Sequence, residues 1–162
     1  MDYTFRTISK KVMGDLHTPV SIYLKVRDIY PESALLESSD FHGNENSLSF
    51  IALRPLASIG INNGECTATF PDETREVTPL TEDYKVGRFK VEGADKKVCG
   101  LFGYTAFDAV RYFENIPVME VHHEENDAPD MLYILYKYIL VFNHFKNELT
   151  LVEMVQDGED SG

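Results

Sequence analysis

The order of apolar and polar positions along this chain predicts mostly short strands. Apolar runs alternate with glycine, proline and asparagine, the residues that end strands and form turns. Between residues 71 and 97 charges are frequent and no period holds, so only a possible strand pair around 88–91 is expected there. Elsewhere the pattern predicts strands at 33–38, 48–53, 58–61, 65–70, 98–104, 131–142 and 149–155.

Turn residues indicate how these strands are connected. Asn63-Gly64 predicts a tight hairpin, because both central positions of a type I′ turn need positive φ. Pro55 is expected to turn the chain between two strands. A further turn is predicted at Phe145-Lys146-Asn147-Glu148, before the last strand.

Helix signals are fewer. Thr18-Pro19 predicts an N-cap followed by proline at the first helical position, and Pro31 ends the apolar stripe that follows. Thr105 is expected to cap a second helix, with apolar residues on one side (Phe107, Val110 and Phe113). The pattern therefore predicts an α+β domain over residues 1–155, built of antiparallel β-sheet hairpins with two or three helices. An acidic tail at 156–162 is expected to be disordered.

Composition narrows the class of protein. The 162 residues fit one domain, and a formal net charge of −12 argues against nucleic-acid or anionic-membrane binding, which need a basic face. No apolar run is long enough to span a membrane, and the first residues lack a signal-peptide pattern. Cys66 and Cys99 are isolated, as in a protein of the reducing cytosol, so a cytoplasmic location is expected.

The stretch Leu36-Glu37-Ser38 combines an apolar strand with an acid and a hydroxyl. Because side chains alternate along a strand, Glu37 and Ser38 face one ligand only if the strand bends or ends there. Strand-end amides and the Ser38 hydroxyl could then hold the carboxylate or ammonium group of an amino acid, with Glu37 making an ionic contact. Taken alone, the stretch is more simply an ordinary strand end.

Two further motifs are more simply structural. Gly100 and Gly103 permit close approach of another backbone or a ligand, but a phosphate-binding loop needs another spacing and a lysine. Asp108, Arg111 and Glu114 are spaced three residues apart, as in weak ion pairs on the surface of a helix. No nucleophile elbow or dinucleotide-binding glycine motif occurs.

Histidines supply the remaining candidate chemistry. His122-His123-Glu124-Glu125 is the one cluster of metal-ligand type, but it lacks the HExxH spacing and is typical of a solvated loop. A small metal-dependent enzyme using His122, His123 and Glu124 stays an alternative. The other histidines are interpreted as surface residues (His17, His42 and His144).

Four stretches, taken in order, resemble the amino-terminal domain of anthranilate synthase component I, a family of chorismate-utilising enzymes. They are Ala34-Leu35-Leu36-Glu37-Ser38, the run 49–57, Gly100-Leu101-Phe102-Gly103-Tyr104, and the run 108–117. The resemblance covers nearly the whole chain and implies one part of a larger two-half β-sandwich. A sister family, aminodeoxychorismate synthase component I, shares the glycine strand and Arg111-x-Phe113-Glu114 but typically lacks an intact Leu-Leu-Glu-Ser, which favours the first family.

The resemblance implies a parent lyase that converts chorismate and glutamine-derived ammonia to anthranilate and pyruvate in tryptophan biosynthesis. Its Mg²⁺ ligands and acid–base groups belong to a carboxy-terminal catalytic domain, which is expected beyond this chain, so neither catalytic residues nor a cofactor are expected here. The implied partners are that domain, a glutamine amidotransferase subunit and tryptophan as inhibitor, and self-association of the isolated domain is also expected. A free-standing small-molecule-binding domain is the alternative.

For individual residues, the resemblance implies two roles. The tryptophan-binding, regulatory residues are Leu36, Glu37, Ser38 and Ser49. A structural role is implied for Gly100, Gly103, Asp108 and Arg111.

Overall fold

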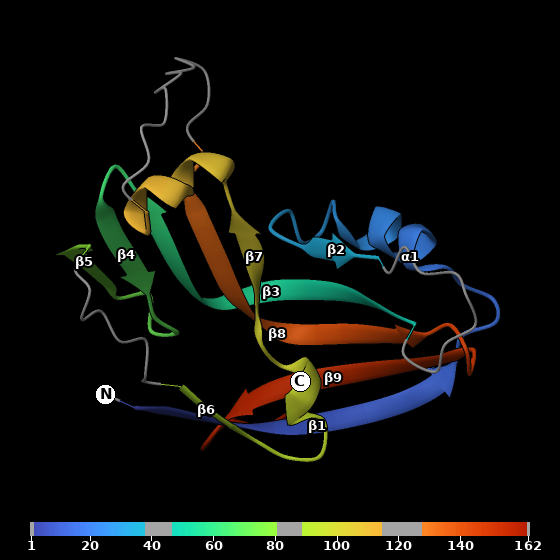
Figure 1. The fold of residues 1–162 in the computed structure, drawn as a ribbon. Coiled ribbons are helices and arrows are strands. Elements are labelled where there is room, and N and C mark those ends of the chain that lie inside the picture. Colours follow the sequence, from blue (N-terminus) through green and yellow to red (C-terminus); the bar gives the residue numbers. More distant parts are fainter. Residues whose placement is uncertain (1, 38–46, 81–88, 115–127, 162) are drawn as a thin grey trace. The chain divides into compact units, whose positions relative to one another are not determined.

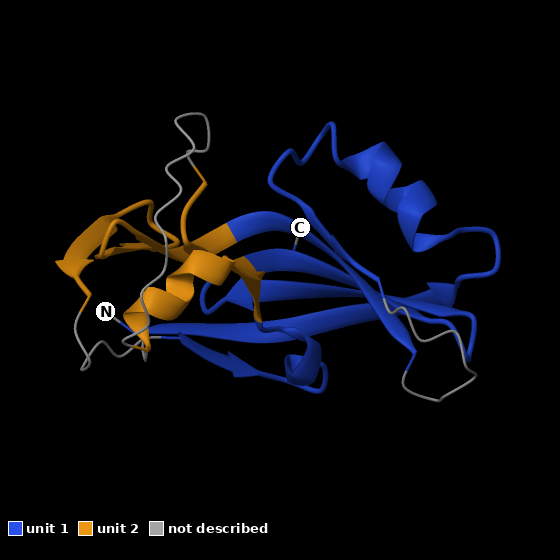
Figure 2. Ribbon diagram, turned by 45° about the horizontal axis from the view of Figure 1, so that its top comes forward, with its two compact units in different colours: residues 1–55, 86–100, 136–162 blue, residues 56–85, 101–135 orange. Residues whose placement is uncertain are grey.

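The computed structural model describes residues 2–37, 47–80, 89–114 and 128–161. They fall into two compact units, coloured separately in Figure 2. Unit 1 comprises residues 1–55, 86–100 and 136–162, and unit 2 comprises residues 56–85 and 101–135. Two long strands, β3 (Leu48–Asn62) and β8 (Met131–Asn143), contribute residues to both units.

Unit 1 is a mixed sheet with one α-helix beside it (Figure 1). Its strands lie in the order β3, β8, β9, β1, β6, with β2 paired to β3. Besides β3 and β8, they are β1 (Tyr3–Met13), β2 (Ala34–Leu36), β6 (Phe89–Glu92) and β9 (Glu148–Gln156). The expected antiparallel pairing holds except at β6, which runs parallel to β1. The strand expected near residues 88–91 is thus present as β6, and its partner is the distant β1, since a parallel neighbour needs a long connection rather than a hairpin.

Strand β1 is absent from the sequence prediction. It pairs with β9 in an antiparallel ladder that runs from Phe5↔Gln156 to Met13↔Glu148. Tyr3 and Phe5 are buried, but most of the strand after them is exposed and polar. Burial is therefore confined to two residues, and the later apolar residues are exposed and follow no strict alternation, so the pattern does not predict an 11-residue strand.

Helix α1 (Pro19–Val26) begins as predicted. The Thr18 side chain accepts a hydrogen bond from the Ser21 amide at 3.1 Å, and the Ser21 hydroxyl accepts from the Thr18 amide at 3.0 Å. This reciprocal pair forms a capping box. The helix ends at Val26, earlier than the apolar stripe suggested, and the Ile29 and Tyr30 amides both donate to the Val26 carbonyl in the turn that follows, at 3.0 and 2.8 Å.

One face of α1 completes the core of unit 1. Buried Ile51, Leu53, Phe142 and Leu149 form a cluster from strands β3, β8 and β9. Partly buried helix residues pack against this cluster (Ile22, Tyr23 and Val26). Burial of an aliphatic side chain stabilises a fold by about 1.5–3 kcal/mol, so this contact holds the short helix in place.

Unit 2 contains β4 (Glu65–Thr69), β5 (Arg75–Pro79) and β7 (Leu101–Thr105). The hairpin between β3 and β4 is confirmed, with φ of 51° at Asn63 and 77° at Gly64. The turn expected at Pro55 is wrong, because β3 continues through that residue. A left-handed Arg54, with φ of 60°, lies just before the proline inside the continuous strand.

Strand β7 pairs with β8 and owes this pairing to a glycine. A Cβ on Gly103 would lie 1.8 Å from the Leu132 carbonyl oxygen, whereas one on Gly100 would meet nothing within 4 Å. The predicted close backbone approach is thus confirmed for Gly103 alone. The strand is largely exposed, with Leu101 50% and Tyr104 42% exposed.

The second helix differs from its prediction. Residues Phe107–Tyr112 form a 3₁₀ helix, η2, which follows Ala106 rather than a Thr105 cap. The Thr105 hydroxyl instead shares a hydrogen bond of 2.8 Å with the Tyr133 hydroxyl. Phe107 and Phe113, which the sequence pattern places on one side of this helix, are 86% and 67% exposed. A further short 3₁₀ helix, η1 (Lys96–Val98), belongs to unit 1.

The acidic tail, predicted to be disordered, makes several contacts with unit 1. The Asp157 amide donates to the Thr4 carbonyl at 3.1 Å, and the Arg6 guanidinium donates to the Glu159 carbonyl at 3.0 Å. The Ser161 hydroxyl donates to Glu153 at 2.8 Å, and Glu153 is buried beside Lys137.

Across the described residues, no helix has the length and apolar character needed to cross a membrane.

Candidate functional site

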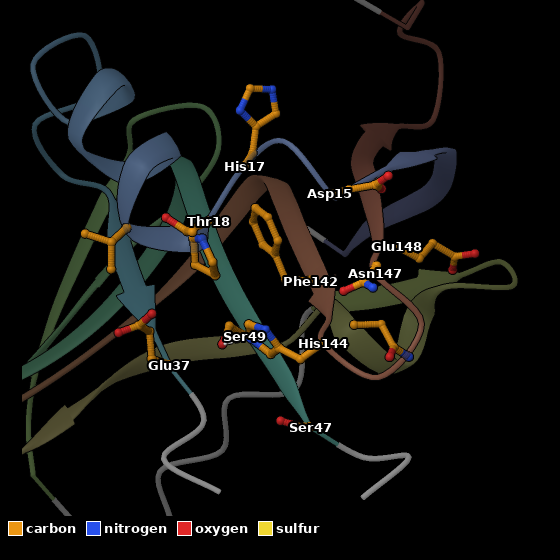
Figure 3. Close-up of a pocket in the computed structure, with 14 residues that line it drawn as sticks. Asp15, His17, Thr18, Glu37, Ser47, Ser49, Phe142, His144, Asn147 and Glu148 are labelled. Carbon is orange, nitrogen blue, oxygen red and sulfur yellow. Dashed lines mark hydrogen bonds between the residues drawn. The ribbon is translucent and has the colours of Figure 1, made fainter. Parts of the chain in front are cut away.

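A pocket of about 470 Å³ opens in unit 1 where several elements end (Figure 3). Its walls come from the segment after β1, the first turn of α1, the residue after β2, the start of β3, and the turn between β8 and β9. Pockets of this volume commonly hold a small molecule. The pocket therefore is the main candidate site in the described part of the chain.

Backbone contacts hold two of these walls together. The Gly14 amide donates to the Asn147 carbonyl oxygen at 2.9 Å, and a Cβ on Gly14 would lie 3.2 Å from the same oxygen. Within the turn, the Lys146 amide donates to the Asn143 side-chain oxygen at 2.9 Å, and Asn147 adopts a φ of 49°. Asparagine tolerates this left-handed conformation, so the tight turn suits the sequence.

The pocket contains a buried hydroxyl that is bonded to a histidine. Ser49 is 1% exposed, and its Oγ lies 2.7 Å from Nε2 of His144. The His144 amide also donates to the Ser47 carbonyl at 3.1 Å, which fixes the residue against the start of β3. Figure 3 shows the two side chains in contact. His144 is exposed, as its surface interpretation predicted, but it also anchors a buried polar group.

Acidic side chains surround the same space. Asp15, Glu37 and Glu148 line the pocket, and Glu148 pairs with Lys11 at 3.0 Å. The amino terminus of α1 also lies in the wall, where the helix dipole provides a partial positive charge. A carboxylate on one side and a helix terminus with hydroxyls on another suit a ligand that carries both an ammonium and a carboxylate group.

The structure brings together part of the predicted regulatory set. Glu37 and Ser49 both line the pocket, because β2 ends at Leu36 and its register places Leu36 opposite Phe50. Leu36 is 40% exposed and is not among the described lining residues. Ser38 lies outside the described residues, so its predicted role stays a prediction.

Sequence reasoning missed the contribution of the distant walls. Thr18, His144 and Asn147 line the pocket but were assigned only to a cap, the surface and a turn. Ser49 and His144 are 95 positions apart, and no spacing pattern connects them. The turn residues themselves were the available signal, since loops that follow rigid strands often carry function.

A second polar group lies in unit 2, and we call it the Arg111 cluster (Arg111, Tyr112 and Asp130). Arg111 donates to an Asp130 carboxylate oxygen at 2.8 Å, and the Tyr112 hydroxyl donates to the same oxygen at 2.6 Å. The Tyr112 hydroxyl in turn accepts from the Gly64 amide at 3.1 Å. Arg111 also donates a hydrogen bond to the Tyr112 hydroxyl. This hydrogen bond and the nearby Asp130 charge raise the pKa of the Arg111 guanidinium.

The Arg111 cluster revises the prediction of local ion pairs on a helix. Arg111 pairs across 19 positions with Asp130, at the start of β8, and the Asp130 carbonyl accepts from the Ala106 amide at 2.7 Å. Asp108 lies exposed in the first turn of η2. The cluster thus connects η2, the β3–β4 turn and the residue before β8, and the structural role implied for Arg111 stays a prediction.

Metal binding has little support in the described residues, which contain no group of three or more His, Cys, Asp or Glu placed to hold an ion. The candidate cluster His122-His123-Glu124-Glu125 and His42 lie outside the described residues.

The thiols of Cys66 and Cys99 are both buried. Burial, with Asp95 nearby, raises the pKa of the Cys99 thiol to about 11.

Comparison with known proteins identifies the class. Residues 32–161 match the family model of chorismate binding enzymes. The chain belongs to the chorismate binding enzyme family.

Particular relatives agree with the resemblance seen in the sequence. Anthranilate synthase component 1 of Thermus thermophilus is 31% identical over 160 residues, which cover 96% of this chain and 34% of that protein. The protein of the same name from Lactococcus lactis is 27% identical over 89% of this chain. A solved anthranilate synthase component I from Streptococcus pneumoniae covers 94% of the chain with 19% identity and a TM-score of 0.48. The chain spans about a third of the length of the curated relatives it matches.

Proposed function

We propose that the chain is the amino-terminal domain of an anthranilate synthase component I, and that it forms part of a tryptophan feedback-inhibition site. The observation that carries this proposal is the pocket in unit 1, where Glu37 and Ser49 lie together. Both residues come from the motifs that resemble the regulatory segment of that family. The parent reaction would convert chorismate and glutamine-derived ammonia to anthranilate and pyruvate.

The chemistry of the pocket supports an amino acid as ligand. Glu37 offers a carboxylate to the ammonium group, and the first turn of α1 offers positive potential to the carboxylate. Phe142 contributes an apolar surface to the wall, which suits a hydrophobic side chain. A pocket of about 470 Å³ is large enough for one such molecule.

The domain also would serve as a scaffold. We propose a carboxy-terminal catalytic domain, holding Mg²⁺, and a glutamine amidotransferase subunit as the partners of the complete enzyme. Exposed apolar side chains on unit 2 support a contact with another protein surface, since exposed large apolar groups often mark interfaces (Leu101, Tyr104, Phe107 and Phe113). Tryptophan binding would inhibit by favouring one arrangement of the domains over another.

The decisive experiment is product formation from chorismate, ammonia and Mg²⁺ by the chain joined to a catalytic domain, with and without L-tryptophan. Anthranilate formation that tryptophan suppresses is the expected result. Aminodeoxychorismate as product would assign the chain to the sister family instead. Insensitivity to tryptophan would remove the feedback site from the proposal.

A variant tests the site itself. Ser38→Phe should relieve tryptophan inhibition and leave anthranilate formation intact, because Ser38 belongs to the motif that the resemblance assigns to the tryptophan site. Cys66→Ser is a suitable control, since Cys66 belongs to unit 2 and does not line the pocket. Unchanged inhibition in Ser38→Phe would contradict the assignment of this segment.

A further inference from the structure

Among the described residues, the second part of strand β1 has a neighbouring strand on one side only. Strand β6 pairs with β1 as far as Arg6, whereas β9 pairs with it as far as Met13. In Figure 1, β1 extends well beyond β6. Backbone amides and carbonyls of residues 8–13 that point away from β9 are therefore available to pair with another strand.

The side chains along this edge combine apolar and basic character. Residues 8–13 include two lysines and no acidic residue, in a chain whose formal net charge is −12. Ile8, Lys10 and Val12 share one face of the strand, because alternate side chains point to the same side. All three are exposed, as is Met13 at the end of the strand. The edge is therefore a basic and apolar surface on an acidic chain.

We propose that residues 8–13 bind an extended segment of a partner protein that has a pair of acidic residues between apolar ones. The partner segment would extend the sheet by main-chain hydrogen bonds to β1. Its carboxylates would lie opposite Lys10 and Lys11, and its apolar side chains opposite Ile8 and Val12, as cross-strand pairs do. This interaction goes beyond the proposed tryptophan site and does not depend on it.

Charge favours an acidic partner over a second copy of this chain. If two copies paired through residues 8–13, the lysines of one strand would lie close to those of the other. Like charges on directly opposed residues destabilise a strand pair, whereas opposite charges stabilise it. The self-association expected for the isolated domain would therefore use another surface.

A purely protective role for the lysines explains less of the structure. Lysine on an edge strand commonly prevents pairing with other chains, but protected edges are usually also short or bulged. Strand β1 has 11 residues and pairs with β9 in an uninterrupted register up to Met13. Lys11 pairs with Glu148 at 3.0 Å, while no ion pair of Lys10 is found within the described ranges. Lys10 is therefore the charge that a partner would meet first.

The test uses the full chain and two synthetic peptides with blocked ends, designed to pair antiparallel to residues 8–13. Val-Val-Glu-Glu-Thr-Val places its glutamates opposite Lys10 and Lys11, and Val-Val-Lys-Lys-Thr-Val is the like-charged control. The glutamate peptide should bind about tenfold more tightly, and its affinity should fall as the salt concentration rises. Amide hydrogen exchange of residues 8–13 should slow when it binds. The same peptide, N-methylated at every amide, should not bind.

A charge reversal tests Lys10 itself. Lys10→Glu should reduce the preference for the glutamate peptide to about twofold or less, because the new carboxylate offsets the charge of Lys11. Lys25→Glu is the matched control, since it makes the same charge change at an exposed position of α1 and should leave the preference unchanged. Thermal unfolding shows whether each variant is folded.

Several results would overturn the proposal. Equal binding of the two peptides, or no binding of either, would remove the acidic partner. Binding of the N-methylated peptide would show that main-chain pairing is not involved. Slow exchange of residues 8–13 before any peptide is added would show that the edge is already covered. Exchange at residues 8–13 that slows with increasing protein concentration would identify a second copy as the occupant instead.

Discussion

The pocket of unit 1 and the Arg111 cluster of unit 2 contain the same kinds of polar side chain in different arrangements. In the Arg111 cluster, Asp130 accepts from both Arg111 and Tyr112, and Tyr112 also accepts from Gly64. In the pocket, Glu37 and Asp15 instead border a space of about 470 Å³. Polar groups that form hydrogen bonds with one another stabilise a fold, whereas polar groups arranged around a space can form hydrogen bonds with a ligand.

This difference explains why two charged motifs of similar appearance in sequence receive different functions. The Asp130 carboxylate is 17% exposed and already bonded, so binding a ligand there would first require breaking strong hydrogen bonds. Glu37 is exposed on a pocket wall and can bind without that cost. Changes to unit 2 are therefore expected to alter stability, and changes to the pocket to alter binding.

The largest effect is expected at Gly103. A Cβ there would lie 1.8 Å from the Leu132 carbonyl oxygen, which is backbone and cannot rotate away. Gly103→Ala should lower the free energy of unfolding by about 3 kcal/mol or more, through disruption of the β7–β8 pairing. Gly100→Ala is the matched control, with nothing within 4 Å, and should change it by about 0.5 kcal/mol or less. Urea unfolding of the two variants measures both, and equal stabilities would contradict the close approach.

The next effect tests the Arg111 cluster. Asp130→Ala should lower the free energy of unfolding by about 2 kcal/mol, since it removes the acceptor of two hydrogen bonds and leaves the Arg111 charge without this partner. Tryptophan binding by the folded protein should stay within about twofold of that of the unchanged protein. Asp108→Ala, an exposed aspartate of the same segment, should leave stability nearly unchanged. A large loss of binding in folded Asp130→Ala would remove the distinction between the two regions.

The converse test is Glu37→Gln in the pocket. This change removes the charge but keeps the size of the side chain, so tryptophan binding should weaken about tenfold while the unfolding curve stays the same. Calorimetry measures the affinity for tryptophan, and thermal unfolding measures the stability of the variant. Asp15→Asn is the matched variant for a second lining carboxylate, and it should weaken binding less. Equal losses would mean that general negative charge, rather than Glu37, binds the ammonium group.

The sequence predicted elements with strong local signals and failed where distant contacts decide. The Asn63-Gly64 turn and the Thr18-Pro19 helix start are determined by a few adjacent residues, and both are confirmed. Strand β1 has only two buried aromatics and is held by its partner β9, so its own residues hardly indicate it. The continuation of β3 through Pro55 likewise depends on neighbouring strands.

The candidate site, like the fold, could be predicted from the sequence only where neighbouring residues determine it. Glu37 and Ser49 were predicted from motifs on neighbouring strands, whose pairing brings them together. His144 was considered only as a surface residue, because its contact with Ser49 joins positions 95 residues apart. Pairing of β8 and β9 creates the turn that presents His144, and no periodicity in the sequence records that arrangement.

The smallest effect concerns the wall that α1 contributes to the pocket. Thr18 both lines the pocket and caps the helix by accepting from the Ser21 amide at 3.1 Å. Thr18→Ala should lower the free energy of unfolding by about 1 kcal/mol, because that amide loses its acceptor, and Thr18→Ser should restore most of it. Since α1 has only eight residues, its amides should exchange hydrogen faster in Thr18→Ala, while those of β4 in unit 2 keep their rates. Faster exchange throughout both units would show that the cap affects global unfolding rather than the pocket wall alone. It would then contradict the distinction between binding in unit 1 and stability in unit 2.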